Sequence, residues 1–504
     1  MDIYLSSALY KFFLKEHPTE TKDEIKKKFS EKEWTTEQVY EFINNYRDLT
    51  YTEENIKKYV DLVSFFQYDM ENDFANYILY TYIIKKQFLD RIYGYGCIIN
   101  AVCELCEKDE DNILDDELLI YLSNYIEIDK LFASENKKIT DEGIKHMQLH
   151  TLDARYSQIT DEGIKHMQLH TLYASRYITD EGIKHMQLHT LDAMYSNITD
   201  EGIKHMQLHT LYASEHMTNK RIKHMLLHTL YASEHMTNKG IKHMQLHTLD
   251  ASDSQITDNG IKHMQLHTLY ASRNMTDEGI KHMHLHTLSA SWHMTDEGIK
   301  HMQLHTLDAR KSQITDEGIK NMQLHTLDAS ISKITDEGIK HMQLHTLGAY
   351  GSQITDVGIK HMQLHTLYAS ESMTDEGIKH MQLHTLHASY LMTDEGIKHM
   401  QLHTLYANNS QITGEGIKHM QLHTLHASYL MTDEGIKHMQ LHTLNAYKSK
   451  ITDEGIKHMQ LHTLNAYKSK ITDEGIKHMH LHTLYAEDSN ITYNIQNGIR
   501  KNKY

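Results

Sequence analysis

The chain has 504 residues and a formal net charge of −17, from 68 acidic and 51 basic side chains. This balance argues against a nucleic-acid partner, because such binding depends on clustered lysine and arginine. Three cysteines are too few for a disulfide framework and fit a reducing compartment. No apolar run reaches the ~18 residues of a membrane helix, and the first residues lack a signal-peptide pattern. We therefore expect an intracellular, cytoplasmic protein that binds neither nucleic acid nor membrane.

The first part of the chain, residues 1–126, is not repetitive, and we expect a mostly helical N-terminal domain there. Apolar residues between Ile56 and Phe66 recur at helical spacing. Cys103 and Cys106 form a CxxC pair, but a zinc site needs four ligands and usually two such pairs. Because no histidine lies between His17 and His146, we expect reduced cysteines and no metal.

The rest of the chain is dominated by one segment, ITDEGIKHMQLHTLDA at Ile139–Ala154, which recurs until about Ile491. Its IKHM tetrad, once IKNM, occurs in eighteen copies, and the interval between copies is always 19 or 20 residues. A fixed period of this size predicts a stacked array in which each unit buries its apolar face against its neighbours. The sequence thus indicates an array over residues 127–492, with a degenerate first strand, and a polar C-terminal cap over residues 493–504.

The first half of each unit predicts a short helix. Thr140 is a favourable N-cap, and Asp141–Glu142 suit the positive end of a helix. Gly143 is unfavourable inside a helix by ~1 kcal/mol relative to alanine, so its recurrence suggests a close packing contact. Ile144 and Met147 share one face at helical spacing and should point inward.

The second half of each unit predicts a strand over Leu149–Ala154. Leu152 and Ala154 should point inward, whereas Thr151 and Asp153 should point outward. Eight intervals are one residue shorter than the other nine, and the missing residue always falls in the turn between this strand and the next helix. An array of helices alone is less favourable. The unit is too short for two helices and two turns, and a single helix would contain a mid-unit glycine and a β-branched threonine.

The unit resembles a leucine-rich repeat, whose consensus is L-x-x-L-x-L-x-x-N/C-x-L. Leu149 and Leu152 match the first two leucines, whereas Ala154, Ser157 and Ile159 take the third leucine, the asparagine and the last leucine. The resemblance implies an α/β solenoid, a horseshoe of parallel strands and short helices. Serine in place of asparagine should weaken the side-chain ladder that satisfies turn backbone groups in that family.

Two stretches of the N-terminal domain resemble the BTB/POZ family: Leu5–Phe13, LSSALYKFF, and Gln38–Met70. The resemblance covers roughly the first 80 residues, and the family's opening strands have no counterpart here. It implies a substrate adaptor that binds cullin, as part of a ubiquitin ligase, through residues 1–126. The wealth of Lys, Asn, Ile and Tyr suggests AT-rich coding, as in amoebae or their giant viruses.

One position, directly after LHTL, differs from unit to unit and should face the concave side of a horseshoe. Tyrosine, which is enriched at protein interfaces, and aspartate predominate there, and we predict a partner-binding strip of Tyr173, Tyr212, Tyr231, Tyr270, Tyr368, Tyr406, Tyr485, Asp153, Asp192, Asp250, Asp308 and Asp328. Drift after recent duplication is an equal alternative, because LHTLNAYKSKITDEGIKHM occurs twice in tandem.

The histidines form two columns, represented by His146 and His150. Their i,i+4 spacing resembles paired zinc ligands, but the glutamate of an HExxH motif is missing, so we expect neutral histidines stacked on the flank of the array. No catalytic signature stands out. We therefore predict a non-enzymatic interaction scaffold without cofactor. The alternatives are a histidine-rich metal-buffering protein and a recently expanded repeat with little selected function.

Overall fold

The structure is a computed structural model that describes residues 102–103, 105–109, 114–479, 481, 483–492 and 500–501. The chain divides into two compact units, and residues 133–145 and 150 onward belong to the second. Most of the expected N-terminal domain, including both stretches that resemble BTB/POZ, lies outside the described residues, as does most of the expected C-terminal cap. Among the described residues, no helix is long and apolar enough to cross a membrane.

Among the described residues of the first unit, Asp116–Ser123 form a helix of two turns, α8. The carboxylate of Asp115 caps it by accepting a hydrogen bond of 2.8 Å from the Leu118 amide. Strand β1 (Lys130–Phe132) follows, where the sequence predicts the degenerate first strand. Cys103 and Cys106 are free thiols, as expected, and burial raises the pKa of Cys106 to about 12.

The second unit is a regular array of three-residue strands. Each strand is parallel to the next and in register with it, so that Leu152 pairs with Leu172 and Leu172 with Leu191. The strands are β2 (Thr151–Asp153), β3 (Thr171–Tyr173), β4 (Thr190–Asp192), β5 (Thr210–Tyr212), β6 (Thr229–Tyr231), β7 (Thr248–Asp250), β8 (Thr268–Tyr270), β9 (Thr287–Ser289), β10 (Thr306–Asp308), β11 (Thr326–Asp328), β12 (Thr346–Gly348), β13 (Thr366–Tyr368), β14 (Thr385–His387), β15 (Thr404–Tyr406), β16 (Thr424–His426), β17 (Thr443–Asn445), β18 (Thr463–Asn465) and β19 (Thr483–Tyr485). Strand β20 (Arg500–Lys501) pairs with β19.

A single helical turn precedes almost every strand. These turns are α9 (Asp141–Ile144), α10 (Asp161–Ile164), α11 (Asp180–Ile183), α12 (Asn219–Ile222), α13 (Asn238–Ile241), α14 (Asp258–Ile261), α15 (Asp277–Ile280), α16 (Asp296–Ile299), α17 (Asp316–Ile319), α18 (Asp336–Ile339), α19 (Asp356–Ile359), α20 (Asp375–Ile378), α21 (Asp394–Ile397), α22 (Gly414–Ile417), α23 (Asp433–Ile436), α24 (Asp453–Ile456) and α25 (Asp473–Ile476). The repeated unit of one strand and one short helix confirms the predicted solenoid-like α/β array.

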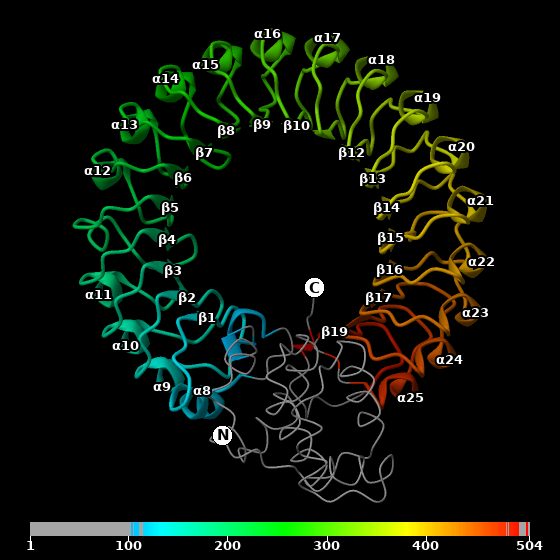
Figure 1. Ribbon diagram of the computed structural model, residues 1–504, viewed down its shortest axis with the longest axis horizontal. Helices are drawn as coiled ribbons and strands as arrows, with labels where there is room; N and C mark the ends of the chain where they lie inside the picture. Colours follow the sequence, from blue (N-terminus) through cyan, green and yellow to red (C-terminus); the bar gives the residue numbers. More distant parts are fainter. Residues whose placement is uncertain are drawn as a thin grey trace, which may run out of the picture. The chain divides into compact units, whose positions relative to one another are not determined.

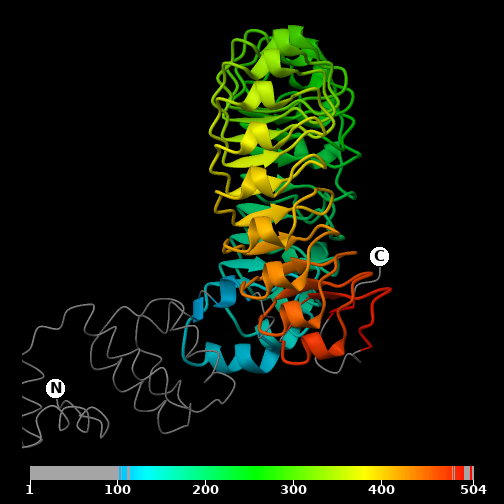
Figure 2. The ribbon, with the colours of Figure 1, turned by 90° about the vertical axis from the view of Figure 1, so that its right-hand side faces the viewer.

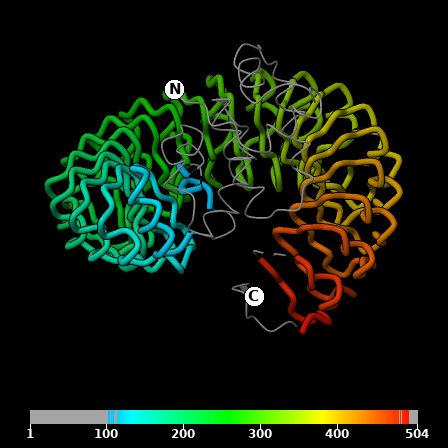
Figure 3. Tube along the Cα trace, turned by 60° about the horizontal axis from the view of Figure 1, so that its bottom comes forward, coloured from blue at the N-terminus to red at the C-terminus, as the bar shows by residue number. Residues whose placement is uncertain are grey.

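Within this unit the strands form the inner side of the curve and the helices the outer side (Figure 1). The side view shows the helices following one another in a row along the array (Figure 2). In the tube view, each repeat is one coil of similar size to its neighbours (Figure 3). The core therefore lies between the strands and the helices, in a narrow layer that continues from repeat to repeat.

The core contains the residues that the periodicity assigned to it. In the repeat around β10, Ile299, Met302, Leu304 and Leu307 are each at most 3% exposed, and Ala309 is fully buried. The first complete repeat shows the same pattern, with Ile144, Met147, Leu152 and Ala154 buried, Lys145 half-buried and His146 exposed. Because strand residues alternate, the third residue of each strand faces the inner side of the array.

The repeats of different length differ only in the turn after the strand, as predicted. In the longer units a serine three residues after the alanine bonds within its own turn, as Ser157 Oγ does to the Ala154 carbonyl at 2.7 Å. In the eight shorter units a serine directly after the alanine donates to the carbonyl of the preceding repeat, as Ser175 does to Ile159 at 2.6 Å. Serine thus satisfies turn backbone groups in both kinds of unit.

Most of the helix glycines are required by a close contact, as their recurrence suggested. Asp161 bonds to the N-cap of the next repeat, accepting from the Thr179 amide at 2.8 Å and from its hydroxyl at 2.6 Å. A Cβ atom on Gly182 would collide with this carboxylate. Equivalent Asp–Thr bonds link most neighbouring repeats, and most of these threonines also cap their own helix, as Thr179 does for the Glu181 amide at 3.2 Å.

Two repeats depart from this arrangement. Arg221 replaces the glycine, and the preceding repeat, at Asp200, is a turn instead of a helix. Arg221 Nε is also the one buried side-chain nitrogen or oxygen among the described residues without a hydrogen-bond partner. Gly414 replaces the aspartate of its repeat, and Thr432, which follows it in the next repeat, makes no side-chain cap. Each departure removes one half of the contact between aspartate and glycine.

Candidate interaction surface

The third strand residues form one continuous row, here called the variable column: Asp153, Tyr173, Asp192, Tyr212, Tyr231, Asp250, Tyr270, Ser289, Asp308, Asp328, Gly348, Tyr368, His387, Tyr406, His426, Asn445, Asn465 and Tyr485. The register places each of them beside its counterpart in the next strand, as Tyr212 lies beside Tyr231. All twelve residues of the predicted partner-binding strip therefore lie in this row. The structure brings them together on the inner face, as the alternation predicted.

Two of these residues are less accessible than expected. Asp153 and Asp192 are only 2% and 6% exposed, although alternation points them away from the core. The guanidinium of Arg155, in the turn after β2, covers them: it bonds to Asp153 at 2.6 Å, lies 3.6 Å from Asp192, and stacks over Tyr173 at 4.8 Å. Burial raises the pKa of Asp192, against the lowering effects of the Met194 amide and Arg155. These carboxylates are already paired within the array.

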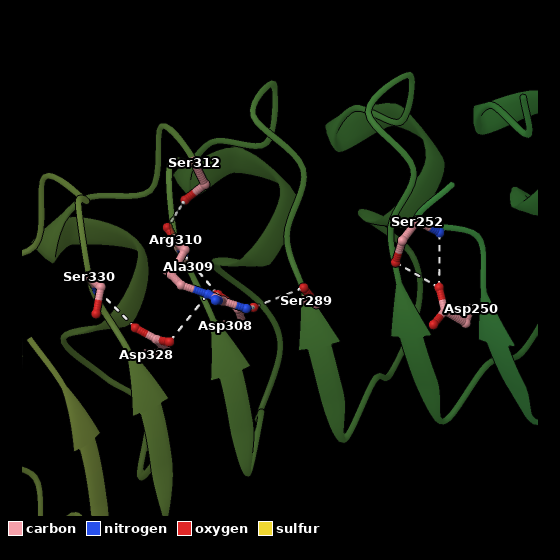
Figure 4. Close-up of polar contacts among 9 residues, drawn as sticks. All are labelled: Asp250, Ser252, Ser289, Asp308, Ala309, Arg310, Ser312, Asp328 and Ser330. Carbon is pink, nitrogen blue, oxygen red and sulfur yellow. Dashed lines mark hydrogen bonds and ion pairs between the residues drawn. The ribbon is translucent and has the colours of Figure 1, made fainter. Parts of the chain in front are cut away.

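A similar but more open pair lies at β10 and β11 (Figure 4). Arg310 donates to Asp308 at 2.7 Å and approaches Asp328 at 3.2 Å, and the Ser289 hydroxyl donates to Asp308 at 3.1 Å. The hydrogen bond to Asp308 raises the pKa of Arg310. Since 58% of the Arg310 side chain remains exposed, a partner can reach this cluster.

Aromatic rings of the variable column stack on one another. Tyr212 and Tyr231 lie with ring centroids 3.9 Å apart, and burial raises the pKa of Tyr212. Farther along, Tyr368, His387, Tyr406 and His426 form a run with centroid distances of 3.7 to 4.2 Å. Burial lowers the pKa of His387 to about 4, so this ring is neutral at pH 7. The run therefore presents a rigid, uncharged row of rings.

A second row of varying residues was not predicted from the sequence. It is the residue three positions after the variable column, here called the turn column: Tyr156, Arg176, Tyr195, Glu215, Glu234, Asp253, Arg273, Trp292, Lys311, Ile331, Gly351, Glu371, Tyr390, Asn409, Tyr429, Lys448, Lys468 and Asp488. Nine residue types occur there, against six in the variable column. Its large apolar side chains are highly exposed; Tyr195 and Trp292 are each 61% exposed. The variation is visible in the sequence, but these residues lie in turns of unequal length, so their equivalence from repeat to repeat is not evident from the sequence alone.

The two rows together form what we call the variable surface, which covers the inner face and the edge at the carboxyl ends of the strands. Members of both rows line one hollow: Tyr231 and Asp250 of the variable column lie there with Glu215 and Glu234 of the turn column. Two exposed positions outside this surface hardly vary: the His146 position is histidine in 17 of 18 copies and the Gln148 position is glutamine in 15 of 18. Exposure alone therefore does not explain the variation.

The opposite edge, where the strands begin, carries a ladder of stacked histidines that runs from His150 to His462, one per repeat. Neighbouring rings lie 4.6 to 4.8 Å apart at angles of 10 to 15°, which confirms the expected stacking for the column represented by His150. Burial and then the neighbouring rings lower the pKa of His170 and His228. Within the described part of the chain, no group of three or more His, Cys, Asp or Glu side chains is arranged to hold a metal ion.

Comparisons with known proteins add no assignment. The sequence matches no protein-family model, and a search of curated proteins found no match.

Proposed function

We propose that the array is a non-enzymatic scaffold of the leucine-rich-repeat class that binds another protein on its variable surface. The strand-and-helix unit of 19 or 20 residues supports the class. A cullin adaptor remains a prediction that rests on the resemblance of residues outside the described part of the chain.

One observation carries the proposal: variation is concentrated on one contiguous surface. Drift after duplication acts on every position that the fold tolerates, and the exposed His146 and Gln148 positions should then vary as much as the turn column. They do not, whereas the turn column uses nine residue types. The varying surface is also where exposed Tyr and Trp gather, and these residues are enriched where proteins bind one another.

Capture of partners by the full chain from an extract of its source cells tests the proposal. One variant replaces Tyr195, Trp292 and Tyr390 with serine; all three are more than half exposed, so the fold should be preserved. The matched control replaces the exposed flank residues Gln265, Gln303 and Gln382 with serine. The proposal expects the first variant to lose a partner that the control retains. Equal capture by both, or loss only in the control, would overturn it.

A further inference from the structure

A groove of about 520 Å³ opens on the variable surface between β4 and β8. Its walls are two long turns, Met194–Tyr195 after β4 and Ser252–Ser254 after β7. Its floor includes the two turns between them, which contain Glu215 and Glu234. The size lies within the range of ~300–1,000 Å³ that is typical of ligand sites.

Turn length explains why a groove forms here. The turns after β5 and β6 belong to consecutive short units, and each lacks one residue relative to the turns on either side. Ser214 draws the first of them inward by donating to the Ile198 carbonyl at 2.6 Å, and Ser233 bonds likewise to Met217 at 3.3 Å. Two short turns flanked by longer ones therefore leave a hollow at this edge.

The lining is acidic and aromatic. Four carboxylates, Glu215, Glu234, Asp250 and Asp253, face one guanidinium, that of Arg273. The Glu215 and Glu234 side chains are 68% and 63% exposed, and their ion-pair neighbours are histidines, which carry charge only when protonated. Ser252 fixes the Asp250 carboxylate by donating its amide at 2.9 Å and its hydroxyl at 2.6 Å (Figure 4).

Two tyrosines complete the lining, Tyr195 from a wall and Tyr231 from β6. Tyr231 is held in place by its stack on Tyr212. A cation near a tyrosine ring gains attraction from the ring face, and a carboxylate adds charge pairing and hydrogen bonds. Carboxylates and tyrosine rings around one hollow therefore favour arginine or lysine side chains over an anionic or purely apolar ligand.

We propose that this groove binds a basic segment of a partner protein, with arginine or lysine side chains placed between the carboxylates and the tyrosines. The inference rests on the proposed function, since it names the chemistry of a partner for the variable surface. Charge complementarity carries it, together with the hollow itself. The acidic groove should also speed the association of a basic segment at low salt.

The test uses the full chain and a fluorescently labelled peptide of alternating arginine and glycine, with binding measured by anisotropy at about 0.05 M and about 0.3 M salt. One variant carries Glu215→Gln and Glu234→Gln. The matched control carries Glu317→Gln and Glu337→Gln, which removes two exposed carboxylates from the helix side of the array. A third variant, Tyr195→Ser, removes the aromatic wall without changing the charge.

The proposal expects the Glu215→Gln, Glu234→Gln variant to weaken peptide binding about tenfold or more at low salt, and Tyr195→Ser to weaken it about threefold, while the control with Glu317→Gln and Glu337→Gln changes it less than about twofold. Wild-type binding should weaken as salt rises. Absence of peptide binding by wild type, or equal binding by wild type and the double variant, would overturn the inference. Either result leaves the proposed function standing if capture still depends on Tyr195, Trp292 and Tyr390; loss of that dependence would count against the scaffold itself.

Discussion

A Cβ atom on Gly163 would lie 2.5 Å from Oδ1 of Asp141 in the preceding repeat. The same carboxylate accepts hydrogen bonds from the Thr160 amide at 2.8 Å and the Thr160 hydroxyl at 2.6 Å. A side chain at this position would crowd the carboxylate that joins two repeats, which explains why glycine recurs against its own helix propensity. Where Arg221 replaces the glycine, Asp200 still bonds to Thr218, at 3.0 and 2.6 Å, but residues 200–205 form a turn instead of a helix.

Replacement of Gly318 by alanine should destabilise the array, although alanine is the better helix former. The new methyl group would crowd Asp296, which accepts hydrogen bonds from the Thr315 amide and hydroxyl at 2.7 and 2.6 Å, so the carboxylate or the helix must shift. We expect a loss of ~1–3 kcal/mol in the free energy of unfolding, measured by denaturant titration. Glu317→Ala on the exposed side of the same helix is the control. A more stable Gly318→Ala would refute the explanation.

The reverse change, Arg221→Gly, should stabilise the array by about 1 kcal/mol. It removes the buried Arg221 nitrogen that has no hydrogen-bond partner and makes room for the aspartate of the preceding repeat, Asp200. Hydrogen exchange of the amides at 200–205, which form a turn here, should slow as the helix is restored. Unchanged exchange and unchanged stability would show that Arg221 does not cause the distortion.

Arg155→Met should lower the free energy of unfolding more than the equivalent change Arg310→Met. Arg155 covers carboxylates whose side chains are 3% and 8% exposed, whereas those beside Arg310 are 24% and 35% exposed. A buried charge left without its partner is strongly destabilising. We expect losses of ~2–4 kcal/mol for Arg155→Met and ~1 kcal/mol or less for Arg310→Met, by thermal denaturation. Equal losses would mean that burial of Asp153 and Asp192 has little energetic weight.

Ile331→Gly should raise stability by up to ~1 kcal/mol. Ile331 has a φ of 51°, a left-handed conformation that is unfavourable for a β-branched residue, and Gly351 takes the same place in the next repeat at 63°. The Ile331 side chain is 52% exposed, so its removal sacrifices little burial. Ile331→Val, which keeps the branching, should bring no gain. A lower melting temperature for the glycine variant would contradict this reading.

Acid should destabilise the array. The pKa values of His286, His325 and His387 are lowered in the fold, mainly by burial, and that of His387 falls to about 4. Unfolded histidines, with pKa values near ~6.5, then bind protons more readily than folded ones. The free energy of unfolding should thus be unaffected above about pH 7, and fall as the pH drops below ~6.5 toward 4.

Melting temperatures at about pH 7.5 and about pH 5.5, at fixed salt, measure this effect. A variant with His387→Asn and His426→Asn should lose less stability on acidification, because it removes two histidines whose pKa values are lowered in the fold. Asparagine should fit there, since it fills the same position at Asn445 and Asn465. An equal or higher melting temperature at the lower pH would show that the acidic excess outweighs the histidines.

Much of the array follows from the sequence because one unit is repeated and its apolar residues face one way. Ile144, Met147 and Leu152 are buried as expected, and Thr140 caps its helix. The burial of Asp153 was not predictable in this way, because it depends on where the longer turn places Arg155. The partner of Gly163 was also hidden, since Asp141 lies 22 residues earlier in the chain and is brought there only by stacking.

The candidate interaction surface was likewise predictable only where it depends on local sequence. Alternation placed the variable column on the inner face, since side-chain direction in a strand is local. The groove depends on neighbouring turn lengths: Glu215 and Glu234 share a hollow with Asp253 because two short turns follow one another. Those contacts are set by the stacking of repeats, which a single unit does not contain.

Photo-crosslinking in the source cells tests the central claim most directly. A photoreactive amino acid replaces Tyr270 or Tyr368 on the variable surface, or Gln265 or Gln363, exposed flank residues of the same repeats. If the variable surface binds a partner, Tyr270 and Tyr368 should crosslink to a defined protein and the two flank positions should not. Crosslinks from the flank alone, or equally from both surfaces, would contradict the account.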